Sequence, residues 1–491
     1  MIIDLETSPL GKKEVKAQAC IVGAGPAGIT LALELARARP DWKIVLCEAG
    51  GQNLATNREK QIYKASLGEK KYAVLDISRR RKLGGTSTHW GGWCKPLDTT
   101  DYEDNHAWDV PAWPFSEKEL EPFFQQTQKW LEIKGDFYDI EKIRDRHAEK
   151  LLELRPNTRV SQHLFRFSPP TRFAERYVDE LEKQDNLTCL LHANLHDLSR
   201  NGDRISAAHV RALDGESITI TADNFVLAMG GMETTRQLLN MQENNTAQGE
   251  GIYSNHLGRY FADHYGARPG ELLAIENLQY SRFLDGDAPV MPVLTFSKND
   301  IRAAGQHNSC MMLRPKPSSD SLLSNYGGNT GLGFKSSEYW HYDIQSIVEP
   351  RPNPSSRIVL TDERCELGLR KMKLDWKLHP GDYKSAYELL GALGDELSAS
   401  GLGRARMADT NTPKSIAAAN GACHHLGTTR MAANAEDGVV DPNLRVFDHE
   451  NLYVASSSVF PRYGYSNPTF TIVALSIRLA NHLAKQNGEK A

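Results

Sequence analysis

A glycine pattern near the N-terminus constrains the fold more than any other feature of the chain. Gly23, Gly25 and Gly28 stand between an apolar run at 18–22 and a longer segment, 29–36, that is apolar on more than one face. At a strand-to-helix turn, the first glycine permits the tight turn, the second lets the main chain approach a pyrophosphate, and the third lets helix and strand pack closely. The segment therefore predicts a parallel α/β fold with phosphates at the N-terminus of a helix.

An acidic residue at the end of the next strand supports this interpretation. Residues 44–47 form a second short apolar run, and Glu48 follows it, 20 residues after Gly28. A carboxylate at this distance accepts hydrogen bonds from a ribose hydroxyl and disfavours the 2′-phosphate of NADP. The pattern by itself does not distinguish FAD from NAD.

Length, charge and cysteine usage exclude several other classes. The chain has 491 residues and a formal net charge of -4, so we expect more than one domain and no nucleic-acid partner. Its seven cysteines are scattered without a C-x-x-C pair, which argues against a disulfide framework and against a metal site. The N-terminus does not resemble a signal peptide, and no apolar stretch approaches the ~18 residues of a membrane helix. We therefore expect a cytoplasmic protein without a membrane segment, and an accessory membrane subunit in another chain stays open.

The rest of the chain divides by its patterning. Residues 101–155 are rich in charged residues and predict mostly helix, and residues 186–228 predict strands. The stretch 266–380 alternates short apolar runs with Pro and Gly, as in an antiparallel sheet. Residues 468–485 carry apolar side chains at helical spacing and predict a closing helix.

Further motifs in order along the chain resemble one family. They are the segments 83–90 (LGGTSTHW), 228–234 (AMGGMET), 349–354 (EPRPNP), 424–431 (HHLGTTRM), 451–461 (NLYVASSSVFP) and 467–469 (NPT). With the glycine pattern, they resemble the glucose–methanol–choline (GMC) oxidoreductase family from about residue 16 to 485. In its motifs the chain is similar to the branch that holds pyranose oxidase and fructose dehydrogenase.

The resemblance implies an α/β fold in which a Rossmann-type FAD-binding domain is interleaved with an α+β substrate domain built on an antiparallel sheet. Residues 1–100, 186–265 and 416–491 are expected in the FAD-binding domain, the last of them with the catalytic motifs, and residues 101–185 and 266–415 in the substrate domain. The cofactor-binding residues expected on this basis are Gly23, Gly25, Gly28, Glu48, Gly84, Gly85, Ser87, His89, Trp90, Ser457, Pro468 and Thr469.

The family's catalytic pair matches two positions near the C-terminus. Oxidation of an alcohol needs a base for the hydroxyl proton and a donor for the oxygen as negative charge develops, while hydride passes to the flavin. His424 occupies the histidine of the family's H-x-x-G-T motif, and Asn467 follows 43 residues later. Asn467 donates hydrogen bonds but is no base, so the general base is assigned to His424. If the register slips by one residue, His425 is the base instead.

His89 raises the question of a covalent cofactor. The resemblance to pyranose oxidase and fructose dehydrogenase implies a bond between this histidine and the flavin 8α-methyl group. The alternative is that His89 lies against the flavin without a bond.

The substrate and the electron acceptor are less constrained. The resemblance implies oxidation of a secondary hydroxyl on a sugar, glycoside or polyol, with oxygen, a quinone or an electron-transfer protein as acceptor. Trp90, Trp93, Tyr339, Trp340 and Tyr342 either line a sugar pocket or belong to the core. The segments 168–173 and 263–264 resemble further family stretches without an assigned role. Two other functions stay open: a non-redox, FAD-containing hydroxynitrile lyase of the same fold, and an NAD-dependent dehydrogenase.

Overall fold

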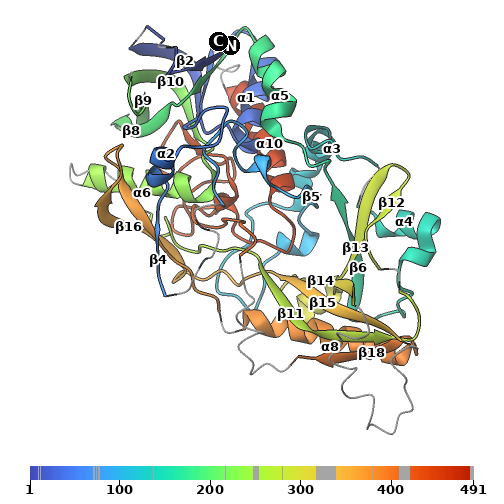
Figure 1. Cartoon of the computed structure of the whole chain (residues 1–491). Helices are drawn as coiled ribbons and strands as arrows, with labels where there is room; N and C mark the ends of the chain where they lie inside the picture. Colours follow the sequence, from blue (N-terminus) through green and yellow to red (C-terminus); the bar gives the residue numbers. More distant parts are fainter. Residues whose placement is uncertain are drawn as a thin grey trace.

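The structure of the protein is a computed structural model with two large sheets (Figure 1). It describes residues 1–486 except 9, 12, 70–71, 73–74, 76–77, 136–137, 216, 247–253, 279, 317–338, 380 and 409–420. One sheet lies with its helices in the upper part of Figure 1, and the other lies below it.

The first sheet has a parallel core, which the glycine pattern predicts. Its strands are β1 (Ile2–Asp4), β2 (Glu14–Val22), β3 (Ile44–Cys47), β7 (Leu187–Leu191), β8 (Asn194–Asn201), β9 (Arg204–Arg211), β10 (Ser217–Leu227) and β19 (Leu452–Val454). The order is β1-β7-β3-β2-β10-β9-β8, and β19 pairs with β10. Strands β1, β7, β3, β2, β10 and β19 pair in parallel, whereas β8, β9 and β10 pair as an antiparallel meander. The strand–turn–helix–strand prediction for residues 16–48 is confirmed, because β2, the helix at Pro26–Ala38 and β3 follow in that order.

The second sheet is antiparallel, as expected for much of the stretch 266–380. Its strands are β5 (Trp93–Cys94), β6 (Val160–Phe167), β11 (Tyr265–Ala274), β12 (Phe283–Asp285), β13 (Ala288–Phe296), β14 (Cys310–Lys316), β15 (Trp340–Val348) and β18 (Gly403–Met407). The order is β18-β11-β15-β14-β13-β6-β5, with β12 beside β13. A third, small sheet joins β16 (Arg357–Arg364), β17 (Arg370–Asp375) and β4 (Ser66–Leu67).

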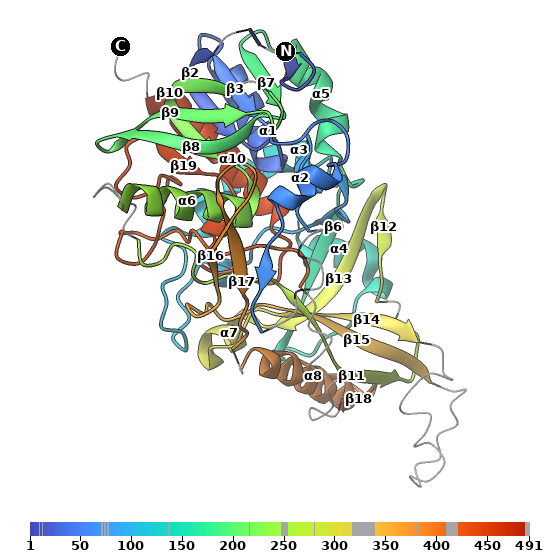
Figure 2. The same cartoon turned by 60° about the vertical axis from the view of Figure 1, so that its left-hand side comes forward.

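Helices cover both large sheets (Figures 1 and 2). They are α1 (Pro26–Ala38), α2 (Asn57–Ile62), α3 (Glu121–Trp130), α4 (Ile140–His147), α5 (Phe173–Lys183), α6 (Gly230–Thr246), α7 (Lys298–Ala304), α8 (Asp382–Ala399) and α10 (Thr469–Gln486). Helices α1 and α10 pack against each other, and both contribute to the core of the parallel sheet. Helix α8 packs on the antiparallel sheet, where its leucines join a second core with residues of β11, β14 and β15. The predicted closing helix is confirmed as α10.

The prediction of mostly helix for 101–155 is wrong for its first part. Within the described part of that stretch, α-helix is confined to α3 and α4, and residues 102–116 are irregular. Asp104 accepts a hydrogen bond from the main-chain N–H of Ala112 at 2.9 Å, so a side chain replaces a helical bond. Pro111 and Pro114 lack the N–H that a helix needs. In the described ranges, no helix is long and apolar enough to cross a membrane.

Candidate active site

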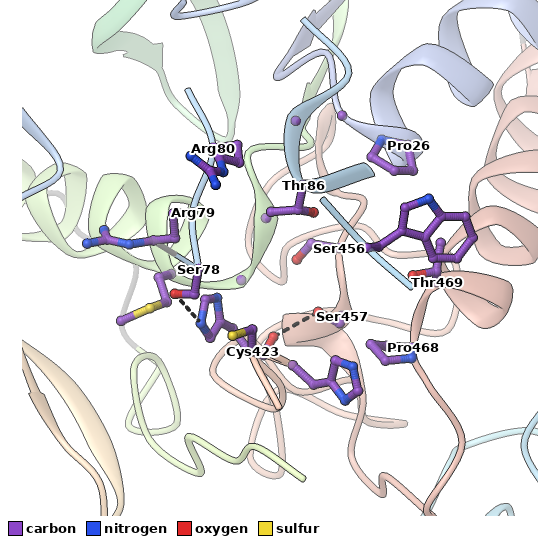
Figure 3. Close-up of a pocket in the computed structure, with 18 of the residues that line it drawn as sticks. Pro26, Ser78, Arg79, Arg80, Thr86, Cys423, Ser456, Ser457, Pro468 and Thr469 are labelled. Carbon is purple, nitrogen blue, oxygen red and sulfur yellow. Dashed lines mark hydrogen bonds between the residues drawn. The ribbon is translucent and has the colours of Figure 1, made fainter. Parts of the chain in front are cut away.

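A cavity of about 760 Å³ runs from the glycine turn to the face of the antiparallel sheet. Its walls come from segments that lie far apart in the sequence, and Figure 3 shows side chains of α1, α10 and the 78–86 segment around it. The predicted site residues that line it are Gly23, Gly25, Glu48, Gly85, Ser87, His89, Trp90, His424, Ser457, Asn467, Pro468 and Thr469. Gly28 and Gly84 lie next to this lining rather than in it.

The three glycines of the turn meet three different environments. At Gly28 a Cβ atom would lie 1.8 Å from the carbonyl oxygen of Gly23, so helix α1 packs directly on the turn. Gly23 has a φ of +107°, and its Cβ atom would lie 2.5 Å from the oxygen of Ala228. At Gly25, by contrast, a Cβ atom would project into the cavity with no heavy atom of the described residues within 4 Å. The main chain at Gly25 is therefore open to a ligand beside the N-terminus of α1.

Glu48 is a buried carboxylate in the wall of the same cavity. It is 5% exposed and accepts main-chain hydrogen bonds from Ala24 and Gly50, each at 2.9 Å. Burial raises the pKa of Glu48 to about 7, against the lowering effect of these two donors. A carboxylate has further lone pairs for a ribose hydroxyl. The open turn, the anion-binding helix end and this carboxylate together fit a dinucleotide such as FAD.

The segment 84–90 packs against the glycine turn and is held from behind by the stretch 168–173. Gly84 donates its N–H to the oxygen of Ala24 at 2.8 Å. Ser87 Oγ accepts from the N–H of Phe173 at 3.1 Å, and Arg172 donates to the oxygen of Ser87 at 2.7 Å. The ring N–H of Trp90 donates to the oxygen of Thr171 at 2.9 Å. The stretch 168–173, which had no assigned role, thus supports the segment that lines the cavity.

His89 stands at the exposed side of this segment and also lines the cavity. Arg80 donates from Nε to His89 Nδ1 at 3.3 Å, so the neutral ring carries its proton on Nε2. Partial burial, with Arg80 and Arg172 nearby, lowers the pKa of His89. Figure 3 shows Arg80 and Thr86 on this side of the cavity.

The structure brings the two residues of the predicted catalytic pair together. Asn467 Nδ2 lies 3.2 Å from His424 Nε2, and no hydrogen-bond partner is present for the buried Asn467 Oδ1 among the described residues. The other ring nitrogen, His424 Nδ1, lies 2.9 Å from His264 Nδ1. Burial, together with His264 and His425, lowers the pKa of His424 well below its usual value. The His424 ring is therefore neutral at physiological pH.

His425, the alternative base, faces a different wall of the cavity. Its Nε2 atom lies 3.3 Å from Ser78 Oγ, and its carbonyl oxygen accepts from Ser457 Oγ at 2.8 Å (Figure 3). Its ring packs between Tyr72 and Phe261, with ring centroids 6.1 Å away in both cases. Burial and the nearby Arg79 lower the pKa of His425 to about 3. The ring of His425 thus packs between aromatic rings and contacts Ser78, whereas the ring of His424 contacts Asn467 and His264.

Asp263 and His264, to which the sequence assigns no role, both contact the segment 422–424. Asp263 is fully buried and accepts the main-chain N–H groups of Ala422, Cys423 and His424 at 3.1, 3.0 and 2.9 Å. It also accepts from the hydroxyl of Tyr72. The resemblance of this dipeptide to a family stretch indicates that it matters. It does not reveal the contacts, because the partners lie about 160 residues away in the sequence.

The aromatic residues proposed for a sugar pocket divide into two groups. Trp90 and Trp93 line the cavity, whereas Tyr339, Trp340 and Tyr342 do not. Tyr342 belongs to the core under α8, and Trp340 is 47% exposed. The side of the cavity formed by the antiparallel sheet is instead polar in part, with Arg314 and Gln345 within 3.3 Å of each other.

Comparison with known proteins finds a family match in the C-terminal part of the chain. Residues 352–476 match the family model for the C-terminal domain that is described as GMC oxidoreductase. This range includes His424 and Asn467. This part of the chain is therefore similar to the C-terminal domain of GMC oxidoreductases. GMC oxidoreductases bind FAD, in agreement with the fit of the glycine turn and Glu48.

Individual relatives agree with this family. The chain is 28% identical over 290 residues to the fructose dehydrogenase large subunit of Gluconobacter japonicus, covering 57% of this chain and 50% of that protein. It is 22% identical over 307 residues to 2-methyl-1,2-propanediol dehydrogenase of Mycolicibacterium austroafricanum, covering 60% and 54%. The chain thus matches about half the length of these curated relatives. The solved structure of pyridoxine 4-oxidase from Mesorbium loti has the same fold, with a TM-score of 0.60 and 20% identity over 95% of this chain and 98% of that one.

Proposed function

We propose that this protein is a GMC oxidoreductase that oxidises a secondary hydroxyl group of a sugar, glycoside or polyol, with His424 as the general base. The observation that carries the proposal is the contact between His424 Nε2 and Asn467 Nδ2 at 3.2 Å, in the cavity that also contains the open glycine turn. FAD, when bound, supplies the acceptor for the hydride at its N5 atom. The names of the fructose and diol dehydrogenases support a hydroxyl-bearing substrate.

The two catalytic residues divide the work at the hydroxyl group. His424 Nε2 takes the hydroxyl proton, and its lowered pKa keeps it unprotonated for this purpose. Asn467 Nδ2 donates a hydrogen bond to the substrate oxygen as negative charge develops there. Because both groups lie within 3.2 Å of each other, one oxygen atom can contact both.

Two further parts of the site bear on cofactor and substrate. Ser457, Pro468 and Thr469 line the cavity, and Thr469 is the first residue of α10. The free N–H groups and partial positive charge of this helix end favour an electron-rich cofactor edge. On the opposite side, Arg314 and Gln345 offer polar contacts that suit a substrate with several hydroxyl groups. Oxygen, a quinone or an electron-transfer protein then reoxidises the cofactor.

The decisive experiment is an anaerobic screen of sugars, glycosides and polyols that follows loss of the flavin absorbance. We expect one of these classes to bleach the flavin, and repetition with oxygen and with a quinone identifies the acceptor. His424→Ala should slow flavin reduction by about 10²–10⁴, and Asn467→Ala by about 10²–10³. The two losses should not add, because both groups act on one oxygen.

His425→Ala is the control for the register. If His425→Ala alone abolishes reduction while His424→Ala reduces normally, the base lies one residue later than proposed. If both variants reduce at the parent rate, oxidation of an alcohol is refuted as the function of this pair. Cleavage of a cyanohydrin without bleaching of the flavin would identify a hydroxynitrile lyase instead.

A further inference from the structure

A chain of three hydrogen-bonding groups leads from the main chain to the proposed base. His264 is fully buried, and its Nε2 atom lies 2.8 Å from the carbonyl oxygen of Gly464. A carbonyl oxygen only accepts hydrogen bonds, so His264 Nε2 must carry a proton. Burial lowers the pKa of His264 to about 4. The ring is therefore neutral near pH 7, and its Nδ1 atom has a free lone pair.

This lone pair determines the proton positions on the next ring. His264 Nδ1 and His424 Nδ1 are 2.9 Å apart, and one of the two must donate. Because His264 Nδ1 is the acceptor, His424 Nδ1 is the donor. A neutral imidazole carries one proton, so His424 Nε2 is left unprotonated. This is the nitrogen that faces Asn467 in the cavity.

We propose that His264 is a positioning residue that fixes the tautomer of His424, so that Nε2 of His424 is the base. The inference rests on the proposed function of His424. It explains why Nε2 of His424, rather than Nδ1, is the base. In the other tautomer Nε2 would carry a proton and could not accept that of the substrate hydroxyl. His264 also lines the cavity, but in this role it acts through the ring of His424.

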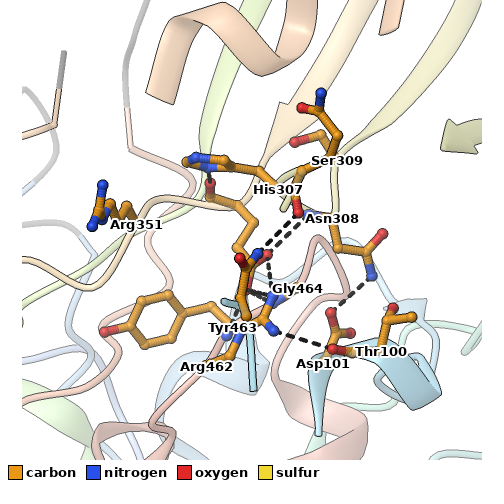
Figure 4. A network of polar contacts seen from close by, with 12 residues as sticks. Thr100, Asp101, His307, Asn308, Ser309, Arg351, Arg462, Tyr463 and Gly464 are labelled. Atoms are coloured by element: carbon orange, nitrogen blue, oxygen red, sulfur yellow. Dashed lines mark hydrogen bonds and ion pairs between the residues drawn. The ribbon is translucent and has the colours of Figure 1, made fainter. Parts of the chain in front are cut away.

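The acceptor of His264 is held in place by a buried polar network, shown in Figure 4. Glu349 accepts the N–H of Gly464 at 2.9 Å, the N–H of Asn308 at 3.0 Å and the guanidinium of Arg462 at 3.1 Å. Gly464 has a φ of +53°, and a Cβ atom there would lie 2.3 Å from a carboxyl oxygen of Asp101. The segment 462–464 therefore has little freedom, and its carbonyl group presents a fixed acceptor to His264.

The main chain of His424 is held by the residue next to His264. Asp263 accepts the three N–H groups of 422–424, whereas His264 bonds the ring of His424. Two consecutive residues thus hold both the main chain and the side chain of the base. Cys423 has a φ of +66°, a conformation that a non-glycine residue adopts only when its surroundings enforce it.

The other ionisable groups around the histidine pair do not replace His264 in this role. Asp263 uses both carboxyl oxygens for main-chain N–H groups and the hydroxyl of Tyr72. Glu349 acts on His264 through charge, and Cys423 and His425 adjoin His424 in the sequence. Arg79 lies behind His425 and forms an ion pair with Glu233. Among the described residues, the side chain at hydrogen-bond distance from His424 Nδ1 is that of His264.

The first test is the protonation of the ring nitrogens in the oxidised holoenzyme. We would label histidine with ¹⁵N, record spectra near pH 7.5, and assign the His424 signals by their loss in His424→Ala. We expect a protonated Nδ1 and an unprotonated Nε2 on His424, and the reverse on His264. A protonated Nε2 on neutral His424 would overturn the proposal, whatever the activity of the enzyme.

The second test compares two substitutions of His264. His264→Phe removes the acceptor, whereas His264→Asn keeps an oxygen near the position of Nδ1. In Ser-His-Asp triads, loss of the correct histidine tautomer costs about 10⁴ in kcat. We expect His264→Phe to slow flavin reduction by about 10²–10⁴ and to shift the His424 proton to Nε2, and His264→Asn to recover most of the rate and the parent spectrum.

A matched control is His449→Phe, since His449 is also buried and bonded to a main-chain carbonyl, that of Phe447, outside the cavity. It should keep the parent rate. Equal rates for the parent and His264→Phe, with His424→Ala inactive, would refute the role of His264 and leave the proposed function intact. Parent-like reduction by His424→Ala would instead refute the proposed function. If His264→Phe does not fold, His264→Asn and the spectrum of the parent still decide.

Discussion

Gly25 offers the sharpest test of where the cofactor phosphates lie. Its main chain has φ −85° and ψ −170°, a conformation open to any residue. A Cβ atom at Gly25 would meet no heavy atom of the described residues within 4 Å and would project into the cavity. We therefore expect Gly25→Ala to fold as well as the parent, and to gain about 0.4–1 kcal/mol of unfolding free energy from the less flexible unfolded chain.

The cost of the added methyl group should appear in cofactor binding. If the pyrophosphate approaches the main chain at Gly25, the methyl group occupies space that the ligand needs. Overpacking of a close contact costs about 1–3 kcal/mol, which corresponds to about 5- to 140-fold weaker binding. The larger side chain of Gly25→Val should abolish FAD retention. Apoprotein titrated with FAD, in a His89→Ala background so that no covalent bond masks the loss, gives the dissociation constant.

Gly28→Ala is the matched control, because it should lower the stability of the apoprotein, which Gly25→Ala should not. Its Cβ atom would lie 1.8 Å from the oxygen of Gly23, so helix α1 must shift, and we expect a loss of about 1–3 kcal/mol in unfolding free energy. Denaturant unfolding of the two apoproteins separates the two effects. A stable Gly25→Ala variant that binds FAD with the parent dissociation constant would refute the assignment of this turn to the phosphates.

Three further predictions concern Glu48, His89 and the pH dependence. Glu48→Ala should weaken FAD binding in the His89→Ala background, since a ribose contact is lost; unchanged affinity would leave Glu48 a role in the main-chain turn alone. Acid denaturation should leave the yellow colour on the polypeptide if His89 is bonded to the flavin, and in the supernatant if it is not. The pKa of His424 lies well below 6.5, so the rate of flavin reduction should stay constant as the pH falls through 6.5. The rate should decline only at lower pH, when His424 becomes protonated. A decline centred at or above pH 6.5 in stopped-flow traces would contradict this.

The geometry of the glycine turn and of the carboxylate beside it could be predicted from the sequence because the information is local. Gly23, Gly25 and Gly28 lie in one turn, and Glu48 ends the adjacent strand of a parallel pair. The steric requirements of a strand–helix turn can be recognised in a short segment of sequence. The fold class is confirmed for the same reason, since strand and helix periods over 14–47 and 469–486 match the observed elements. The assigned domain boundaries and the roles of the site residues stay predictions.

The substrate side depends on contacts between distant segments, which periodicity does not reveal. Residues 102–116 belong to the stretch predicted as mostly helix but are irregular, because Asp104 accepts a main-chain N–H of the same stretch and Pro111 and Pro114 lack one. Gln345, Ser346 and Ile347 of β15 line the cavity, whereas Trp340 of the same strand is exposed and Tyr342 belongs to the core under α8, so residue type gave no guide to which of them face the cavity. His264 could be seen as part of a family stretch, but its bond to His424 spans 160 residues.

The buried ion pair of Glu349 and Arg462 is better explained by its positioning of nearby main chain than by a contribution to the free energy of unfolding. Both side chains are at most 1% exposed, and such pairs contribute little net free energy because both ions lose their hydration. Glu349, however, accepts main-chain N–H groups from both the 308 and the 463–464 segments. It therefore ties the antiparallel sheet to the segment that carries the carbonyl of Gly464, three residues before Asn467. The same carboxylate thus holds the main chain whose carbonyl group is the acceptor for His264. His264 in turn contacts one ring nitrogen of His424, and Asn467 contacts the other.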